Sequence, residues 1–196
     1  MTAVGPRARD AHIWARHPDD FYCEPQWLDK RIFEEIQFVG EIVDPCCGLG
    51  RIPEAAISAG YKARGYDKVQ RSFWCQQERD FLADVWTGEL VDNIVCNPPY
   101  ALAQAIISEA LLRSADKVVM ILPARFCWGD ERSRWLESTH PRQILAVTPR
   151  PSMPPGPVIE AGIKPGGGKE DFSVFVWECG FAGKPEAGWL RRDCTK

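Results

Sequence analysis

Residues 41–50 read Glu-Ile-Val-Asp-Pro-Cys-Cys-Gly-Leu-Gly and decide the fold of this chain. The apolar start predicts a buried strand, which ends at the acidic Asp44 and passes into a glycine-rich loop. A helix is expected directly afterwards, at 52–59. This order of strand, glycine loop and helix is typical of α/β sheets that bind ligands at the carboxyl ends of parallel strands.

The composition of the loop selects among ligands. Gly48 and Gly50 let the backbone turn tightly, but Pro53 stands where a dinucleotide-binding loop has its third glycine. No Gly-Lys-Ser/Thr follows, which excludes a nucleotide triphosphatase loop. An acidic strand end beside such a loop suits a ligand with an ammonium group and a ribose. Asp67, at the next acidic strand end, is placed to hold a ribose diol.

A second motif follows the apolar run 92–96, which predicts another buried strand ended by proline. It reads Asn97-Pro98-Pro99-Tyr100 and places an amide, two residues without backbone N–H groups and an aromatic ring where a strand leaves its sheet. A plain turn is the alternative, since Asn-Pro marks turns. The glycine loop upstream favours a functional site.

Taken in order, these motifs resemble those of the amino-group methyltransferases that modify adenine N6 in DNA. The resemblance covers roughly 21–178 and rests on residues 44–50, 66–67, 80–81 and 97–100. It implies S-adenosylmethionine as cofactor and adenine in DNA as acceptor. The tetrapeptide also occurs in RNA adenine methyltransferases and in enzymes that methylate glutamine in release factors, so these acceptors stay open. A non-catalytic, cofactor-binding subunit of a larger complex is a further alternative, against which the intact tetrapeptide speaks.

The resemblance also implies the site residues. The catalytic residues would be Asn97, Pro98, Pro99 and Tyr100. Those that bind the cofactor would be Asp44, Pro45, Cys46, Gly48, Gly50, Asp67, Lys68, Asp80, Phe81 and Asn97. Asp84 is an alternative to Asp80. The substrate would contact Tyr100, Arg125 and Phe172, and no metal site is expected.

The chemistry expected of the tetrapeptide is orientation of an amine. An adenine amine is a poor nucleophile because its lone pair is delocalised into the ring. If the Asn97 side-chain oxygen and the Pro98 carbonyl each accept one amine hydrogen, the lone pair is directed at the methyl group. Tyr100 would stack on the base, which in a duplex is first flipped out. No cysteine lies in the tetrapeptide to act as a nucleophile, and Cys96 is expected to point into the core.

The expected fold is α/β and Rossmann-like, of the class I methyltransferase type. We expect a mostly parallel seven-stranded sheet with helices on both faces and a terminal antiparallel hairpin. The predicted helices are 26–36, 52–59, 69–77 and 102–113, the strand 117–122 follows them, and the hairpin joins 144–148 and 173–178.

The chain divides into a partly disordered arm at 1–20 and one methyltransferase domain at 21–196. The Pro- and Gly-rich loop 149–171 is expected beside the active site, as a lid or a guide for the substrate, with a plain disordered insertion as the alternative. No separate target-recognition domain is expected after residue 178. Specificity is therefore expected from this loop, from the arm, from a specificity subunit or from a second copy of the chain, or else to be low.

The composition of the chain limits the kinds of partner that it is expected to bind. The chain has 196 residues, a net charge of −3, no long apolar run and eight cysteines without a metal-type pair, which together indicate a reduced, cytoplasmic protein without a membrane partner. The net charge weakens a nucleic-acid assignment. However, the window 123–169 carries seven basic residues against four acidic ones, and this favours nucleic acid, DNA first, as the partner. The basic residues are Arg125, Arg132, Arg134, Arg142, Arg150, Lys164 and Lys169.

Overall fold

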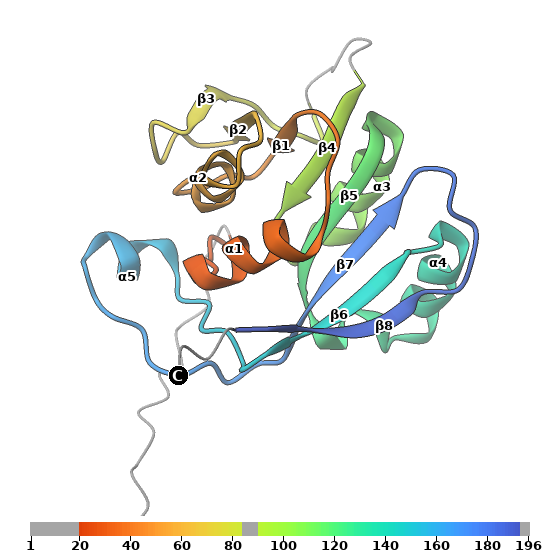
Figure 1. Cartoon of the computed structure of the whole chain (residues 1–196). Coiled ribbons are helices and arrows are strands. Elements are labelled where there is room, and N and C mark those ends of the chain that lie inside the picture. Colours follow the sequence, from red (N-terminus) through yellow and green to blue (C-terminus); the bar gives the residue numbers. More distant parts are fainter. Residues whose placement is uncertain (1–19, 84–89, 193–196) are drawn as a thin grey trace, which may run out of the picture.

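The computed structural model describes residues 20–83 and 90–192 (Figure 1). In these ranges eight strands form one sheet in the order β3-β2-β1-β4-β5-β7-β6-β8. The strands are β1 (Ile42–Asp44), β2 (Ala63–Asp67), β3 (Cys75–Glu78), β4 (Val91–Cys96), β5 (Ser114–Pro123), β6 (Gln143–Thr148), β7 (Phe172–Glu178) and β8 (Glu186–Arg191). The helices are α1 (Gln26–Glu35), α2 (Arg51–Ser58), α3 (Ala103–Arg113), the 3-10 helix η1 (Ala124–Cys127), α4 (Asp130–Thr139) and α5 (Gly156–Glu160). The predicted arm at 1–20 lies outside the described residues, except for Asp20.

The sheet is mostly parallel, as the sequence predicts. Strands β3, β2, β1, β4 and β5 run in one direction. β7 is antiparallel to both β5 and β6, which confirms the expected terminal hairpin, and β8 is parallel to β6. The sheet of the described residues therefore has eight strands where seven were expected, and β8 was not recognised from the sequence. Its sequence buries only Leu190 and offers no apolar alternation to detect.

The helix predicted at 69–77 is wrong. Residues 69–74 form bends and a turn, and β3 takes up the end of this segment. β3 is an edge strand that pairs only with β2 and buries only Cys75. Because its other residues are polar and exposed, the pairing with β2 rather than a local apolar pattern determines its conformation.

Two hydrophobic cores lie on opposite faces of the sheet, as alternation along β5 shows. Val119 and Ile121 belong to the core covered by α1 and α2, whereas Val118, Met120 and Leu122 belong to the core covered by α3 and α4 (Figure 1). Successive strand residues point to opposite faces, so a strand covered on both sides is apolar throughout. This explains the continuous apolar run that predicted β5.

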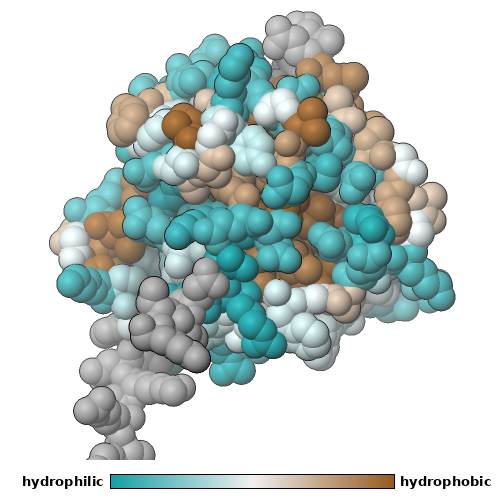
Figure 2. Space-filling model, viewed as in Figure 1, coloured by the Kyte–Doolittle hydropathy of each residue, from teal (hydrophilic) through white to brown (hydrophobic). Residues whose placement is uncertain are grey.

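The helices follow from their sequences. In α1, Leu28, Ile32 and Phe33 form one buried stripe at helical spacing. α2 accommodates Pro53 because a residue in the first helical turn needs no intrahelical N–H bond. In the described ranges, none of these helices has the length and apolar character needed to cross a membrane. Hydrophilic side chains predominate on the face in Figure 2, and apolar ones form separate groups.

The fold brings the predicted motifs to one edge. β2, β1 and β4 are neighbours in the sheet and end at Asp67, Asp44 and Cys96, the residue before Asn97. After β1, the chain continues to β2 and β3 on one side of β1, and then crosses to β4 on the other side. The strand order therefore reverses between β1 and β4. Open α/β sheets bind ligands at such a point.

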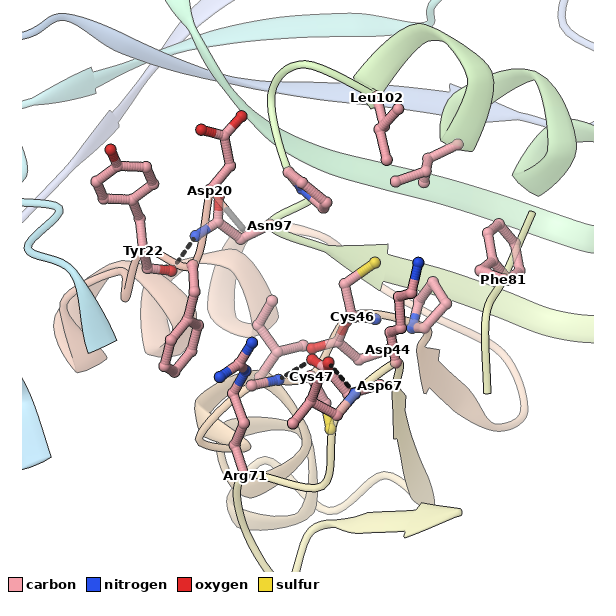
Figure 3. Close-up of a pocket in the computed structure, with 18 of the residues that line it drawn as sticks. Asp20, Tyr22, Asp44, Cys46, Cys47, Asp67, Arg71, Phe81, Asn97 and Leu102 are labelled. Atoms are coloured by element: carbon pink, nitrogen blue, oxygen red, sulfur yellow. Dashed lines mark hydrogen bonds between the residues drawn. The ribbon is translucent and has the colours of Figure 1, made fainter. Parts of the chain in front are cut away.

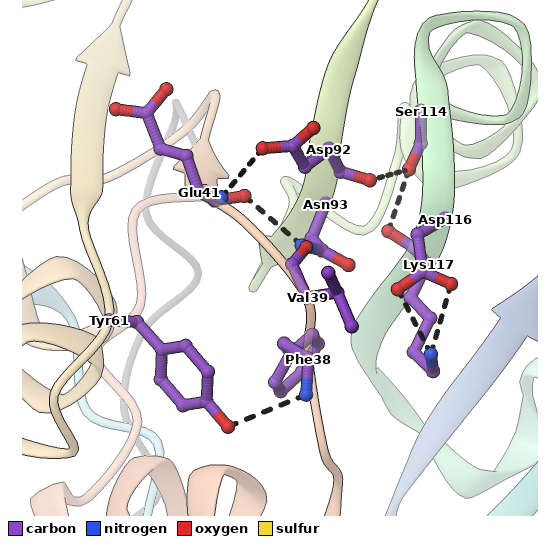
Figure 4. A network of polar contacts seen from close by, with 9 residues as sticks. All are labelled: Phe38, Val39, Glu41, Tyr61, Asp92, Asn93, Ser114, Asp116 and Lys117. Atoms are coloured by element: carbon purple, nitrogen blue, oxygen red, sulfur yellow. Dashed lines mark hydrogen bonds and ion pairs between the residues drawn. The ribbon is translucent and has the colours of Figure 1, made fainter.

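A polar network fixes the opposite end of these strands (Figure 4). The fully buried Asn93 donates from Nδ2 to the carbonyl oxygens of Val39 at 2.7 Å and Glu41 at 3.2 Å. The Glu41 N–H donates to Asp92 Oδ2 at 2.8 Å. These bonds hold the chain that enters β1 against the start of β4, and so set where both strands end.

Replacing Asn93 by Ala should lower the free energy of unfolding by about 1–3 kcal/mol, because both donated bonds are lost in a buried position. Urea denaturation measures this change. Gln104→Ala, on the exposed face of α3, serves as the control and should stay within about 0.5 kcal/mol of the parent. Equal effects of the two changes would contradict the role given to the network.

Candidate active site

A cavity of about 410 Å³ lies at the carboxyl ends of β1, β2 and β4 (Figure 3). Its volume falls in the range of sites for small molecules and cofactors. The figure shows Asn97 and Tyr22 on one side of it and Phe81 on the other. The lining includes these residues predicted to bind the cofactor: Asp44, Pro45, Cys46, Gly48, Asp67, Lys68, Asp80, Phe81 and Asn97.

Asp67 ties two loops together at the floor of this cavity. Its Oδ2 accepts the Gly48 N–H at 2.8 Å, and its Oδ1 accepts the Val69 N–H at 3.0 Å. Each carboxylate oxygen keeps a further lone pair. The carboxylate can therefore hold the glycine loop in place and still accept hydroxyl groups of a ligand.

Gly48 is required by both conformation and space. Its φ is +48°, and a Cβ there would lie 2.7 Å from the Phe21 ring. Phe21 itself lies under the guanidinium group of Arg71, which is 4.2 Å from the ring centroid. The glycine thus lets residues 20–24, which we call the strap, lie directly over the loop.

Gly50 does not line the cavity, contrary to the role predicted for it. It is the N-cap of α2, with φ +82°, and a Cβ there would lie 2.2 Å from Trp74 Cδ1. Position 50 therefore requires glycine because of its left-handed backbone conformation and because Trp74 packs against it.

Two buried carboxyl groups face the cavity. Asp44 is 2% exposed and Glu24 is 7% exposed, and burial raises the pKa of each. Asp44 Oδ1 accepts the Cys46 N–H at 3.1 Å. No lysine or arginine of residues 20–83 and 90–192 forms an ion pair with either group, while Arg51 donates to the backbone carbonyl of Glu24. A cationic ligand group would stabilise both charges.

Asp80 and Phe81 form the far wall. Asp80 Oδ2 pairs with Lys68 at 3.1 Å, and its Oδ1 accepts the Leu82 and Ala83 N–H groups. The hydrogen bond from Lys68 is the main reason that the pKa of Asp80 is lowered. Phe81 is 4% exposed and offers an apolar surface. The alternative residue, Asp84, lies outside the described residues.

A second cavity of about 570 Å³ adjoins the first. Its lining includes Tyr100, Arg125 and Phe172, the residues predicted to contact the substrate. Asp20, Tyr22 and Ala101 line both cavities. The tetrapeptide lies at this junction: Asn97 and Pro99 line the first cavity, Tyr100 lines the second and Pro98 lines neither.

Aromatic rings form one wall of the second cavity. The rings of Tyr22 and Tyr100 are nearly parallel, at 8°, with centroids 6.0 Å apart. The Phe172 ring lies 5.9 Å from that of Tyr100. Stacking of rings at such distances is favourable, and a planar ligand could use the same surfaces.

The segment 149–171 contributes another wall. Residues 151–153 and 167–170 line the second cavity, and α5 lies between them. The strap is tied to this segment by backbone bonds from Cys23 N–H to Pro154 O at 2.9 Å and from Gly156 N–H to Phe21 O at 3.0 Å. Both cavities therefore share the strap as a common wall.

The strap was hard to recognise from sequence. Sequence reasoning did not select Glu24 or Tyr22 as site residues. The available signal for a functional role was an acidic residue, Glu24, in the Phe-Tyr-Cys-Glu-Pro stretch just before an amphipathic helix. The contact of this stretch with Asn97 depends on tertiary structure.

The excess of basic residues predicted for 123–169 needs correction. Arg125 pairs with Glu170 at 2.8 Å and Arg150 pairs with Asp171 at 2.7 Å, and both acids lie just beyond the window that was counted. Arg134 pairs with Asp130 and Arg142 with Glu186. Arg132 and Lys169 line the second cavity and have no ion pair with another residue of the described ranges. Two of the basic residues without an ion pair in the described ranges thus lie at the cavity.

Comparisons with known proteins identify the fold. No family model matches the chain, and no curated protein matches it. Among solved structures, the methyltransferase subunit of a type I restriction-modification system from Streptococcus thermophilus has a TM-score of 0.56 and 12% identity, and covers 90% of this chain and 46% of its own. A 23S rRNA methyltransferase has a TM-score of 0.51 and 14% identity, and the match covers 80% of this chain and 68% of the methyltransferase chain.

A third similar structure is the magnesium protoporphyrin IX methyltransferase of Synechocystis with bound S-adenosylmethionine. It has a TM-score of 0.52 and 12% identity, and covers 78% of both chains. The present chain spans less than half of the Streptococcus thermophilus chain, and these identities establish similarity of fold. The chain has the Rossmann-like fold of class I methyltransferases.

Gly50→Ala and Gly60→Ala test the packing assigned to Gly50. Both residues have positive φ, +82° and +94°, but a Cβ at Gly60 would meet nothing within 4 Å. Each change should cost about 1–2 kcal/mol of stability for the left-handed conformation. Gly50→Ala should cost about 1–3 kcal/mol more, because Trp74 must move. Thermal unfolding compares the two variants, and equal losses would refute the packing argument.

Proposed function

We propose that this protein is an S-adenosylmethionine-dependent methyltransferase that acts on the exocyclic N6 amine of adenine in DNA. The observation that supports this proposal most directly is the meeting of two cavities at Asn97-Pro98-Pro99-Tyr100. One cavity has groups suited to the methyl donor, and the other has aromatic and cationic groups suited to a nucleotide. The class I methyltransferase fold agrees with this arrangement.

The residues of the first cavity fit the methyl donor. Asp44 and Glu24 are buried carboxyl groups that form no ion pair with a lysine or arginine of the described residues, and they suit its ammonium group. Asp67 accepts two backbone N–H groups and has lone pairs left for ribose hydroxyls. Phe81 offers an apolar surface for the adenine ring. When bound, S-adenosylmethionine supplies an electrophilic methyl group on its sulfonium.

The contribution of the tetrapeptide is to orient the acceptor amine. Asn97 Oδ1 accepts the Tyr100 hydroxyl at 3.1 Å and has a second lone pair for one amine hydrogen. Orientation of this kind raises the rate without a covalent intermediate. Asn97 faces a cavity and Pro98 does not, so we assign the main acceptor role to Asn97.

DNA is the preferred acceptor because the order of the motifs resembles the DNA adenine methyltransferases. Arg132 and Lys169 beside the aromatic rings of the second cavity suit a phosphate next to a stacked base. RNA is the second candidate. In its favour, the chain aligns with 68% of a 23S rRNA methyltransferase but with only 46% of the Streptococcus thermophilus subunit.

Asp67→Ala should weaken binding of S-adenosylmethionine by about 1–3 kcal/mol, the scale for hydrogen bonds to a charged group. Isothermal titration calorimetry measures this change. Glu137→Ala, which removes an exposed carboxylate on α4, is the control and should bind as the parent does. Unchanged affinity of the Asp67 variant would show that the ribose assignment is wrong.

Asn97→Ala should nearly abolish methyl transfer and leave cofactor affinity almost unchanged, because the side chain acts on the acceptor amine. Single-turnover kinetics and calorimetry separate the two quantities. Tyr100→Phe should retain more activity than Tyr100→Ala, since it keeps the ring and loses only the hydroxyl bond to Asn97. A parallel loss of cofactor binding in Asn97→Ala would favour a structural turn.

The acceptor is identified by incubating the protein with tritiated S-adenosylmethionine and, separately, duplex DNA, single-stranded DNA, total RNA and a release factor. N6-methyladenine in DNA is the expected product. Label confined to RNA or to glutamine would replace the proposed acceptor, and no label with intact cofactor binding would favour a non-catalytic subunit. Affinity for DNA should fall as salt rises, and Lys169→Ala should lower the log-log slope by about one.

A further inference from the structure

The orientation of the Asn97 amide is set by two acceptors from the strap. Asn97 Nδ2 donates to the Tyr22 carbonyl oxygen at 3.1 Å and to Glu24 Oε2 at 2.7 Å (Figure 3 shows the bond to Tyr22). A carbonyl and a carboxylate have no hydrogen to donate. The amide nitrogen must therefore face the strap, and Oδ1 must face Tyr100, whose hydroxyl donates to it.

We propose that Glu24 is a positioning residue for methyl transfer, which holds and polarises the Asn97 amide so that Oδ1 is ready to accept a hydrogen of the substrate amine. This inference rests on the function proposed above and names a residue outside the tetrapeptide and the glycine loop. Glu24 acts through Asn97 and needs no contact with the acceptor.

The geometry favours a strong effect. The 2.7 Å bond has a carboxylate acceptor, and charge-assisted bonds of this length are about twice as strong as neutral ones. Glu24 is 7% exposed, so little water screens its charge. In a low-dielectric site, a negative charge on the amide N–H side shifts electron density towards the amide oxygen. Oδ1 then becomes a better acceptor for the amine hydrogen.

The groups around Glu24 determine when it is charged. Its charge interacts with Arg51 on α2 and with Asp29 on α1, Asp44 on β1, Cys23 and Tyr100. Burial raises the pKa of Glu24, whereas Asn97 and Arg51 lower it. Both oxygens of the fully buried Asp29 lack a hydrogen-bond partner among residues 20–83 and 90–192, and burial raises its pKa well above the usual range.

A change at Glu24 should leave the strap in place. Backbone bonds from Cys23 to Pro154 and from Gly156 to Phe21 hold the strap independently of the Glu24 side chain. Phe21 remains against Gly48 as well. The effects of substitutions at Glu24 can therefore be assigned to the side chain.

The test compares Glu24→Gln and Glu24→Ala with the parent in single turnover at saturating cofactor. The transfer rate of Glu24→Gln should fall about tenfold, because Gln accepts the Asn97 N–H in a neutral hydrogen bond. The rate of Glu24→Ala should fall about a hundredfold, because no hydrogen bond remains. Glu54→Gln on α2 removes an exposed carboxylate nearby and should keep the parental rate. A parental rate in Glu24→Ala would overturn the proposal, as would a loss confined to cofactor affinity.

The pH dependence gives a readout that a purely structural role would not change. Because the pKa of Glu24 is raised, the parental rate should fall with decreasing pH as Glu24 becomes protonated, starting above the usual glutamate range. Glu24→Gln cannot titrate at this position and should lack this acidic limb. An identical limb in the Gln variant would assign it to another group and refute the inference.

A spectroscopic readout separates this inference from the proposed function. The side-chain ¹⁵N–H₂ signals of Asn97 should shift with pH in the parent as Glu24 titrates, and they should stay constant in Glu24→Gln. This measurement requires no acceptor or activity. If the signals shift but no substrate is methylated, the contact is correct and the proposed function fails. If they do not shift, the positioning role is wrong whatever the activity.

Discussion

The adjacency of β1 and β4 is the constraint on which the rest of the structure depends. Strand order reverses between these two strands, so the glycine loop after β1 and the tetrapeptide after β4 leave the sheet side by side. The buried Asn93 network fixes the register at the other end of the same pair. A shift of one strand by one residue would exchange its two faces and move its end by about 3.3 Å. The pairing of β1 with β4, fixed at the end of the sheet opposite the site, therefore determines the geometry of the site.

The parts of the fold that were predictable are those with strong local patterns. The doubly covered stretch 118–122 of β5 is continuously apolar, and α1 has a clear buried stripe, so both were found from the sequence. β3 and β8 bury one residue each, and their conformation comes from pairing with β2 and β6. A local pattern contains no information about such partners, which is why one was predicted as a helix and the other was missed.

The site was predictable to a similar extent. The glycine loop, Asp67 and the tetrapeptide carry sequence signals because backbone conformation and chemistry restrict the residues there. Gly50 shows that a glycine of the same loop can be needed for backbone conformation and packing without lining the cavity, since its φ is +82° and Trp74 occupies the space of its missing side chain. Glu24 meets Asn97 across 73 positions of the chain, and the acids that neutralise Arg125 and Arg150 lie 45 and 21 positions away. Contacts of this range follow only from the complete fold.

The strap explains how a protein of this size can build a polar site with few residues. Its backbone supplies one acceptor to Asn97, Glu24 supplies another, Phe21 packs on Gly48, and Tyr22 stacks beside Tyr100. Glu24, Asp29 and Asp44 are nevertheless buried together, and burial of several carboxyl groups costs stability unless a cation joins them. The positive charge of Arg51 offsets part of this cost, because it stabilises the charged form of Glu24. Binding of a cationic donor would offset more of it, so the same carboxyl groups that destabilise the free protein favour the bound state.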